Sequence, residues 1–142
     1  MPATDKVHEP IRTAIEKDGW TITDEPYTIS IVEKNKKKDI LFADLRAEKI
    51  VADQPVRVIV VEIKSFDGES LMYALEQALG QFRIYRKVVA KLEPSSKVYL
   101  ALTDISYQLL LSRPTFNLLM DDREFSLIIV DIAQEKITEW IE

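Results

Sequence analysis

The 142-residue sequence contains no cysteine, only three glycines and no long hydrophobic run. Without cysteine it can form no disulfide, no thiolate zinc site and no cysteine nucleophile. Its longest apolar runs, such as residues 58–61 and 127–130, are far shorter than the roughly 20 residues of a membrane-spanning helix. The first residues also lack the apolar core of a secretory signal. These absences predict a cytoplasmic protein that does not associate with membranes.

The scarcity of glycine also narrows the chemistry. The three glycines are not clustered, so there is no glycine-rich loop to cradle the phosphates of a nucleotide. No Ser/His/Asp set has the spacing of a nucleophile elbow. The net charge of −5 argues against a purely electrostatic nucleic-acid coat, although it leaves room for a local DNA-binding patch. Nucleotide hydrolysis and acyl transfer are therefore poorly supported.

What is present is the composition of a globular domain, with 46% hydrophobic and 30% charged residues. The length suits one domain with a sizeable core, so we expect a single domain over residues 1–142. Hydrophobic periodicity and turn residues predict helices at residues 5–17, 69–92, 106–111 and 116–121, and strands at 20–32 (broken near 25–26), 40–45 (continued at 48–52), 56–64, 98–102, 127–132 and 136–141. This order predicts an α/β (α+β) fold with a central mixed β-sheet flanked by helices.

The strand at residues 56–64 carries the first candidate site residues. It is apolar on both faces, which is typical of a central strand, yet it ends in Glu62-Ile63-Lys64. Side chains alternate across a strand, so Glu62 and Lys64 share a face. Taken alone, this tripeptide is most simply a strand end whose two charges pair in solvent.

Asp44, in the preceding apolar strand, changes that interpretation. If the two strands are neighbours, Asp44 lies beside Glu62, and two close carboxylates repel each other unless a cation or a proton intervenes. Mg²⁺ takes oxygen ligands, and the backbone carbonyl of Ile63 would supply a third. Lys64 would then face the metal-bound water or a scissile phosphate.

A polar flank of the long predicted helix supplies a third element. Gln77, Gln81 and Tyr85 recur at intervals of four residues and therefore share a face. One interpretation is a wet helix edge. The other is a pair, Gln81 and Tyr85, that orients Lys64, a water or a phosphate.

These three elements together resemble the PD-(D/E)xK nuclease superfamily: Asp44, then Glu62-Ile63-Lys64, then Gln81 and Tyr85 as the QxxxY element of its RecB-like branch. Ala43 stands where the name motif has proline. The resemblance implies a restriction-endonuclease-like core, catalytic roles for Asp44, Glu62, Lys64, Gln81 and Tyr85, and Mg²⁺ or Mn²⁺ as cofactor. It also implies that His8, the only histidine, can join Asp44, Glu62 and Ile63 as a metal ligand. Glu9 and Glu16 are rival acidic candidates on the same helix.

A longer resemblance covers nearly the whole chain. Residues 17–23, 44–49, 61–66, 75–81, 130–132 and 137–141 are similar, in order, to the XisH family. That family is known as a controlling factor for excision of the fdxN element in heterocyst-forming cyanobacteria. The resemblance implies an accessory role in DNA rearrangement, beside a site-specific recombinase and a XisI-like partner. Two alternatives remain open: an active Mg²⁺-dependent endonuclease, and a catalytically silent nuclease fold used for protein–protein interaction.

Three surface features are possible contact sites. Arg83, Arg86, Lys87 and Lys91 cluster on the long helix, and residues 34–38 hold four lysines. Both sets would suit DNA phosphates, although a solvated surface is the simpler interpretation. Trp140 and Ile141 make the last strand apolar, which would suit a homodimer or a XisI-like partner if that strand lies at an edge.

Overall fold

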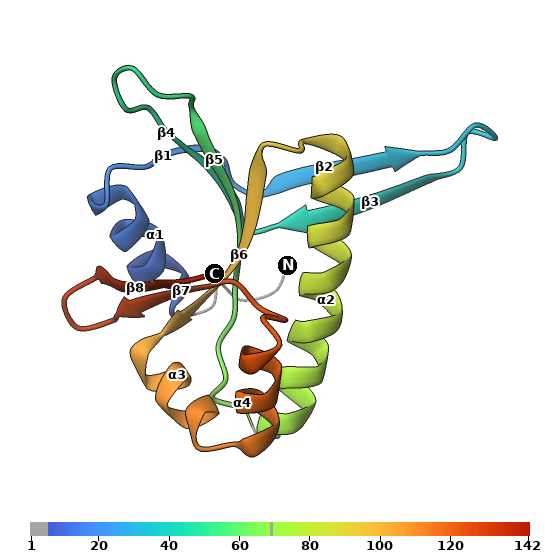
Figure 1. The fold of residues 1–142 in the computed structure, drawn as a ribbon. Helices are drawn as coiled ribbons and strands as arrows, with labels where there is room; N and C mark the ends of the chain where they lie inside the picture. The colour runs from blue at the N-terminus through green and yellow to red at the C-terminus, as the bar shows by residue number, and fades with distance from the viewer. Residues whose placement is uncertain (1–5, 69) are drawn as a thin grey trace.

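The computed structural model describes residues 6–68 and 70–142, which form a mixed sheet of six strands flanked by helices (Figure 1). The helices are α1 (His8–Lys17), α2 (Leu71–Leu92), α3 (Asp104–Leu111) and α4 (Pro114–Asp121). The strands are β1 (Thr21–Asp24), β2 (Tyr27–Val32), β3 (Lys38–Ala43), β4 (Leu45–Lys49), β5 (Arg57–Ile63), β6 (Ser96–Thr103), β7 (Leu127–Asp131) and β8 (Lys136–Ile141).

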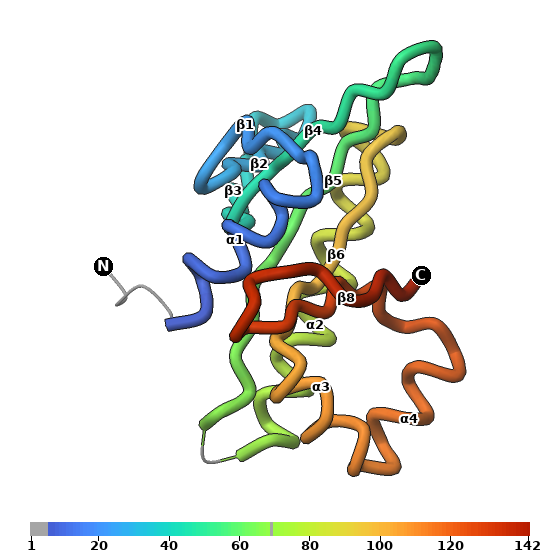
Figure 2. Tube along the Cα trace, turned by 90° about the vertical axis from the view of Figure 1, so that its left-hand side faces the viewer, coloured from blue at the N-terminus to red at the C-terminus, as the bar shows by residue number. Residues whose placement is uncertain are grey.

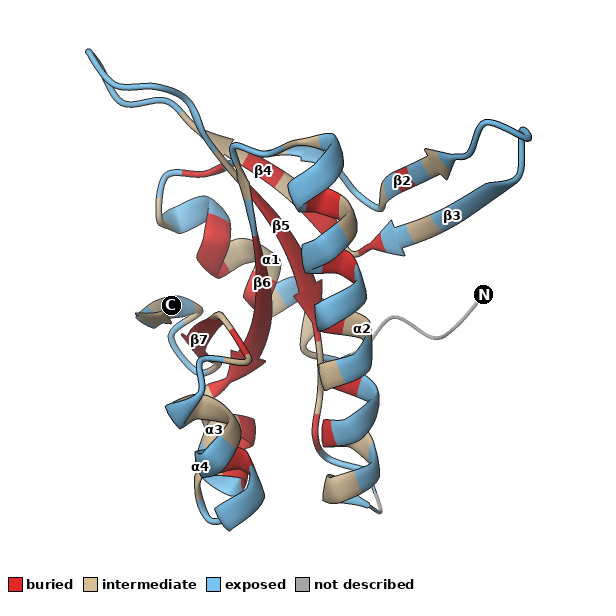
Figure 3. Ribbon diagram, turned by 45° about the vertical axis from the view of Figure 1, so that its right-hand side comes forward, coloured by how far each residue is buried: buried red, intermediate tan, exposed pale blue. Residues whose placement is uncertain are grey.

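The main sheet has the order β1-β4-β5-β6-β7-β8 and confirms the predicted mixed architecture. The pairs β5–β6 and β6–β7 are parallel, and the other pairs are antiparallel. Strand β5 lies inside the sheet, and its last five residues are all buried (Figure 3). The apolar core therefore has two layers. Val60 packs in the layer that α2 covers, while Ile59, Val61 and Ile63 pack in the layer that α1 covers.

Helix α2 covers one face of the sheet. The Oγ atom of Ser70 accepts a hydrogen bond from the Tyr73 backbone N–H at 3.1 Å and caps the first turn. The buried residues recur at helical spacing: Leu75, Ala78, Phe82, Tyr85 and Val89. Tyr85 was expected on the polar flank, but only 6% of it is exposed, because its ring packs with the apolar stripe. No helix in the described part of the chain is long and apolar enough to cross a membrane.

Helix α1 ends as predicted at Asp18-Gly19, where Gly19 takes φ +98 and turns the chain into β1. Its predicted start at Asp5 lies outside the described residues. The expected break near residues 25–26 separates β1 from β2.

The prediction of one strand over residues 40–45 is wrong, because the chain bends at Asp44. Strand β3 before the bend pairs only with β2, in a separate two-stranded sheet. Strand β4 after the bend enters the main sheet between β1 and β5. A side-chain oxygen of Asp44 accepts the hydrogen bond of the Ile63 backbone N–H at 2.7 Å. This bond replaces a ladder bond at the point where the strand leaves the sheet.

Strand β8 is an edge strand, as predicted, but its apolar side chains are already engaged. Trp140 is half-buried and contacts Tyr99 and Trp20, with ring centroids 5.1 and 5.8 Å away. Ile141 packs on the opposite core layer. The pairing of this edge with a second copy or a XisI-like partner stays a prediction.

Candidate metal centre

Asp44 and Glu62 meet where β4 and β5 begin to separate. The antiparallel register pairs Leu45 with Val61, so the next position along each strand places Asp44 beside Glu62. The two carboxyl groups lie within hydrogen-bonding reach of each other. The neighbouring strands thus produce the juxtaposition that the sequence predicted, although Asp44 occupies a bend instead of a strand interior.

The pair is electrostatically unfavourable when both groups are ionised. Glu62 is 7% exposed. Burial raises the pKa of Glu62, the hydrogen bond and the charge of Asp44 raise it further, and together they bring it to about 9 against the opposing charge of Lys64. A proton shared between the two carboxyl groups relieves this repulsion, and so would a divalent cation.

Gln81 and Tyr85 connect α2 to Glu62. The Gln81 Nε2 atom donates hydrogen bonds to the Glu62 Oε2 atom at 2.8 Å and to the Tyr85 hydroxyl at 3.1 Å. The Tyr85 hydroxyl donates to the carbonyl oxygen of Phe42 at 2.7 Å. Burial raises the pKa of Tyr85, which keeps this donor protonated. Gln77, one turn before Gln81, is exposed and has no hydrogen bond to this network among the described residues. Sequence reasoning missed the Phe42 carbonyl, because a backbone acceptor leaves no sequence signal.

Lys64 follows the last residue of β5. Its backbone N–H donates to the Ala101 carbonyl at 3.1 Å, which holds the residue beside β6. Its charge is close enough to oppose the rise in the Glu62 pKa. Among the described residues it makes no ion pair within 4.0 Å. The ammonium group is thus available to a phosphate or another anion.

The first helix carries His8, Glu9 and Glu16, the other candidate metal ligands. The His8 Nε2 atom lies 2.7 Å from a Glu25 carboxylate oxygen, and Arg12 binds the other oxygen at the same distance. Glu9 is exposed, and Glu16 pairs with Arg12. Among residues 6–68 and 70–142, no three histidine or acidic side chains converge into a metal-binding group. A ligand role for His8 stays a prediction.

The donor set nevertheless suits a hard cation. Mg²⁺ is commonly bound through only one or two carboxylates and keeps several waters or substrate oxygens. Asp44 and Glu62 supply the carboxylates, and the carbonyl of Ile63 is the candidate third oxygen. Among the described residues, no arginine forms an ion pair with the buried Glu62 carboxyl, which leaves it open to a cation.

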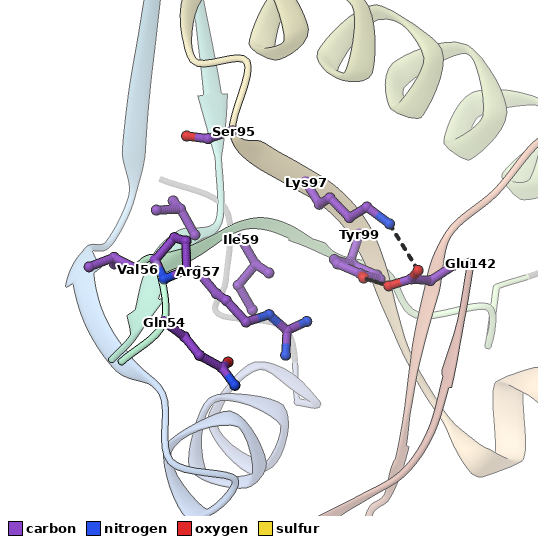
Figure 4. A pocket seen from close by; sticks show the side chains of 10 residues that line it. Gln54, Val56, Arg57, Ile59, Ser95, Lys97, Tyr99 and Glu142 are labelled. Carbon is purple, nitrogen blue, oxygen red and sulfur yellow. Dashed lines mark hydrogen bonds and ion pairs between the residues drawn. The ribbon is translucent and has the colours of Figure 1, made fainter. Parts of the chain in front are cut away.

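A pocket of about 460 Å³ lies at the opposite end of β5, beside its first residues (Figure 4). Its cationic lining residues are Arg57 and Lys97. The carboxylate of Glu142 lies at this pocket, 2.9 Å from the Lys97 Nζ atom, and also accepts a hydrogen bond from the Tyr99 hydroxyl. Lys97, Tyr99 and Glu142 already satisfy one another, so the pocket is a weaker candidate for chemistry than the Asp44–Glu62 centre.

The cationic cluster of α2 does not approach this centre along the helix. Arg83 comes two residues after Gln81 and therefore projects from the opposite flank, where it lies 3.7 Å from Glu124. The guanidinium of Arg86 lies over the Phe82 ring at 5.2 Å. Gln81 and Arg83 leave the helix in different directions, and a contact between this cluster and DNA phosphates stays a prediction.

The sequence model described as "XisH protein" matches residues 1–138 of the 142. This chain belongs to the XisH family. Two crystal structures share its fold. An XisH family protein from Nostoc punctiforme is 30% identical, with a TM-score of 0.81 over 97% of this chain and 100% of that one. An fdxN element excision controlling factor protein from Anabaena variabilis is 31% identical, with a TM-score of 0.79 over 95% of this chain and 97% of that one. No match was found among curated proteins.

The XisH match confirms the resemblance predicted from the sequence, and it extends over nearly the whole chain. Residues 44–49 and 61–66, which carry the Asp44–Glu62 centre, lie inside the matched range. The centre therefore lies in the part of the chain that matches the family, but the match assigns no reaction to it.

Proposed function

We propose that this chain is a controlling factor for excision of a DNA element, and that it contributes a divalent-cation site acting on DNA phosphodiesters. The first half of the proposal is supported by family membership and by the name of the Anabaena relative. The second half rests on one observation: the carboxyl groups of Asp44 and Glu62 converge at the end of β5, with Lys64 beside them.

The arrangement agrees with the PD-(D/E)xK pattern on a restriction-endonuclease-like core. Mg²⁺ or Mn²⁺ held by Asp44, Glu62 and the Ile63 carbonyl would polarise a phosphoryl oxygen and lower the pKa of an attacking water. Gln81 orients the Glu62 carboxylate through its 2.8 Å hydrogen bond. Lys64 offsets negative charge that develops on the phosphate in the transition state.

In this proposal the chain acts in the cytoplasm, beside a site-specific recombinase and a XisI-like partner. The described part of the chain has no obvious separate DNA-recognition module, and its net charge is −5. Sequence selection is therefore assigned to the partners, and the phosphodiester step to this chain.

Cleavage of plasmid and linear DNA in Mg²⁺ or Mn²⁺ tests the proposal, with the protein alone and with a XisI-like partner. We expect Glu62→Gln and Lys64→Ala to abolish cleavage. The matched controls Glu76→Gln and Lys136→Ala change exposed residues outside the centre and should cleave as the parent does.

Cleavage that persists in both site variants would remove the proposed mechanism. Absence of cleavage under every condition, together with intact partner binding, would favour the catalytically silent alternative. Calorimetric titration with Mn²⁺ separates a site that binds metal without cutting from one that binds no metal.

A further inference from the structure

The two-stranded sheet of β2 and β3 forms a ribbon that leaves the body of the molecule beside α2 (Figures 1 and 2). Its inner face packs against the core through Ile29 and Ala43. The register makes its outer face a single row of paired residues, all of them exposed: Thr28 with Phe42, Ser30 with Ile40, and Val32 with Lys38. Three of these side chains are large and apolar, at 45% to 58% exposure.

The root of this ribbon lies at the candidate metal centre. Phe42 precedes Asp44 by two residues, and its carbonyl oxygen accepts the hydrogen bond of Tyr85. The root of the ribbon is therefore joined to Glu62 through the hydrogen bonds of Tyr85 and Gln81.

The tip of the ribbon is positively charged. Lys34, Lys36, Lys37 and Lys38 outnumber the two acidic residues of the same turn, Glu33 and Asp39, in a chain whose net charge is −5. Lys91 of α2 lines the same hollow as Lys34. Among the described residues none of these lysines forms an ion pair within 4.0 Å. Local charge of this sign, at the far end of a ribbon rooted at a candidate phosphodiester site, is complementary to a polyanion.

The dimensions of the ribbon suit duplex DNA. A major groove is about 12 Å wide and admits a two-stranded ribbon. Six residues per strand extend for roughly 20 Å, and paired strands lie only about 4.8 Å apart. Hydroxyl side chains can bond base edges, and apolar side chains can contact thymine methyl groups. The outer face offers both kinds.

We propose that the β2–β3 ribbon docks in the major groove of duplex DNA and delivers a backbone phosphate to the centre at its root. The lysines of the tip contact phosphates, and Phe42 and Ile40 contact base edges. This inference rests on the proposed function, because it names the surface through which the same site meets DNA.

Fluorescence anisotropy with a labelled duplex of mixed sequence tests it, using the full chain in EDTA so that no cleavage occurs. The tip variant is Lys34→Gln with Lys37→Gln and Lys38→Gln. It omits Lys36, whose backbone has φ 66. The control variant, Lys17→Gln with Arg113→Gln and Lys136→Gln, removes the same number of exposed cations elsewhere.

We expect the tip variant to bind roughly tenfold more weakly than the parent. We also expect the slope of log affinity against log salt to fall by about two to three, because each lost phosphate contact contributes about 0.9. The control variant should stay within twofold of the parent. Phe42→Ala should weaken binding by about fivefold without changing the salt slope, since apolar contacts to bases release no counterions.

Four results would overturn the inference: no duplex binding by the parent, equal losses in both triple variants, unchanged binding by the tip variant, or tighter binding of the single strand than of the duplex. Light scattering provides a further check. A change of oligomeric state in Phe42→Ala without a change in DNA affinity would assign the surface to a second copy of the chain.

The cleavage assay keeps the two proposals separate. If the parent binds duplex through the tip but never cuts it, this inference stands and the proposed chemistry is overturned. If the parent cuts DNA in Mg²⁺ but the tip variant binds duplex as tightly as the parent, the proposed chemistry stands and the docking role of the ribbon is overturned.

Discussion

Two clusters of partly or fully buried carboxylates lie on the same face of the main sheet. They differ in the groups that surround the carboxylates. In the first, the Arg46 guanidinium binds Glu93 at 2.6 Å and Glu48 at 2.7 Å. The Tyr27 hydroxyl donates to the other oxygen of Glu93 at 3.0 Å. In the second, Glu62 has Asp44 for a neighbour and the neutral side chain of Gln81 as its donor.

The pKa values follow from these partners. Burial works against ionisation of Glu93, but the hydrogen bonds from Arg46 and Tyr27 outweigh it, and the pKa of Glu93 lies below its usual value. Burial also raises the pKa of Glu62, and there the Asp44 carboxyl adds to the effect. Arg46 fixes the end of α2 to the sheet through Glu93. At the Glu62 centre, by contrast, burial and the Asp44 carboxyl disfavour the ionised form, which a bound cation would stabilise. The first cluster is therefore expected to contribute stability, and the second is the one that the proposed function uses.

The strongest way to break the comparison is Arg46→Ala. This change leaves Glu93 and Glu48 without their cation, and all three side chains are less than one-third exposed. We expect the free energy of unfolding at pH 7 to fall by about 2–3 kcal/mol, because breaking a partly buried ion pair strands its charge. Urea denaturation followed by circular dichroism measures it.

Arg113→Ala, at an exposed helix N-cap without a side-chain cap hydrogen bond, is the control and should change stability by less than about 0.5 kcal/mol. Equal losses in the two variants would show that the Arg46 cluster does not fasten α2.

The sequence predicted the Glu62 centre better than the Arg46 cluster. Local spacing predicts which side chains of the centre share a face. Alternation along a strand pairs Glu62 with Lys64, and a four-residue interval on a helix pairs Gln81 with Tyr85. The Arg46–Glu93 contact joins residues 47 positions apart, and no local pattern encodes it.

The bend at Asp44 was missed for a related reason. Residues 40–49 contain no glycine or proline, so local propensity favours one continuous strand. The bend depends on the Ile63 backbone N–H, which bonds the Asp44 side chain from 19 residues away. The mixed sheet itself could be predicted, because the doubly apolar strand at 56–64 demands cover on both faces.

A pH comparison of Glu62→Gln with Glu93→Gln sharpens the contrast. The folded-state pKa of Glu62 is raised, so its contribution is complete near pH 4.5 and is lost as the pH rises towards 9. In EDTA at pH 8, we expect Glu62→Gln to be more stable than the parent by about 1–2 kcal/mol. The pKa of Glu93 is lowered, so its contribution is present at pH 8 and is lost in acid, and Glu93→Gln should be less stable than the parent.

Thermal unfolding between pH 4.5 and 9 measures the melting temperatures of both variants. Each is measured with and without about 10 mM MgCl₂. Magnesium should raise the melting temperature of the parent and leave that of Glu62→Gln unchanged, because a ligand stabilises only the state that binds it. Parallel pH profiles for the two variants would contradict the assignment of different roles.

A smaller effect is expected from Tyr85→Phe, which tests the link between the centre and α2. The change removes the hydroxyl that donates to the Phe42 carbonyl at 2.7 Å and accepts from Gln81. A loss of about 1 kcal/mol in the free energy of unfolding is expected, the usual contribution of one such bond. Tyr73→Phe, on an exposed part of the same helix, should be neutral in the same urea titration.

The smallest effect on stability is expected from Lys64→Ala, although its effect on function should be large. Lys64 makes no ion pair within 4.0 Å with a described residue, so the free energy of unfolding should change by less than about 0.5 kcal/mol. Its positive charge opposes a cation at Glu62, so Mn²⁺ should bind the variant at least as tightly as the parent. Cleavage should nevertheless be lost, because the group that faces the phosphate is gone. Weaker Mn²⁺ binding by the variant in calorimetry would instead mean that Lys64 positions the two carboxylates. Its ammonium group would then have a structural role in the centre and would not act on the phosphate.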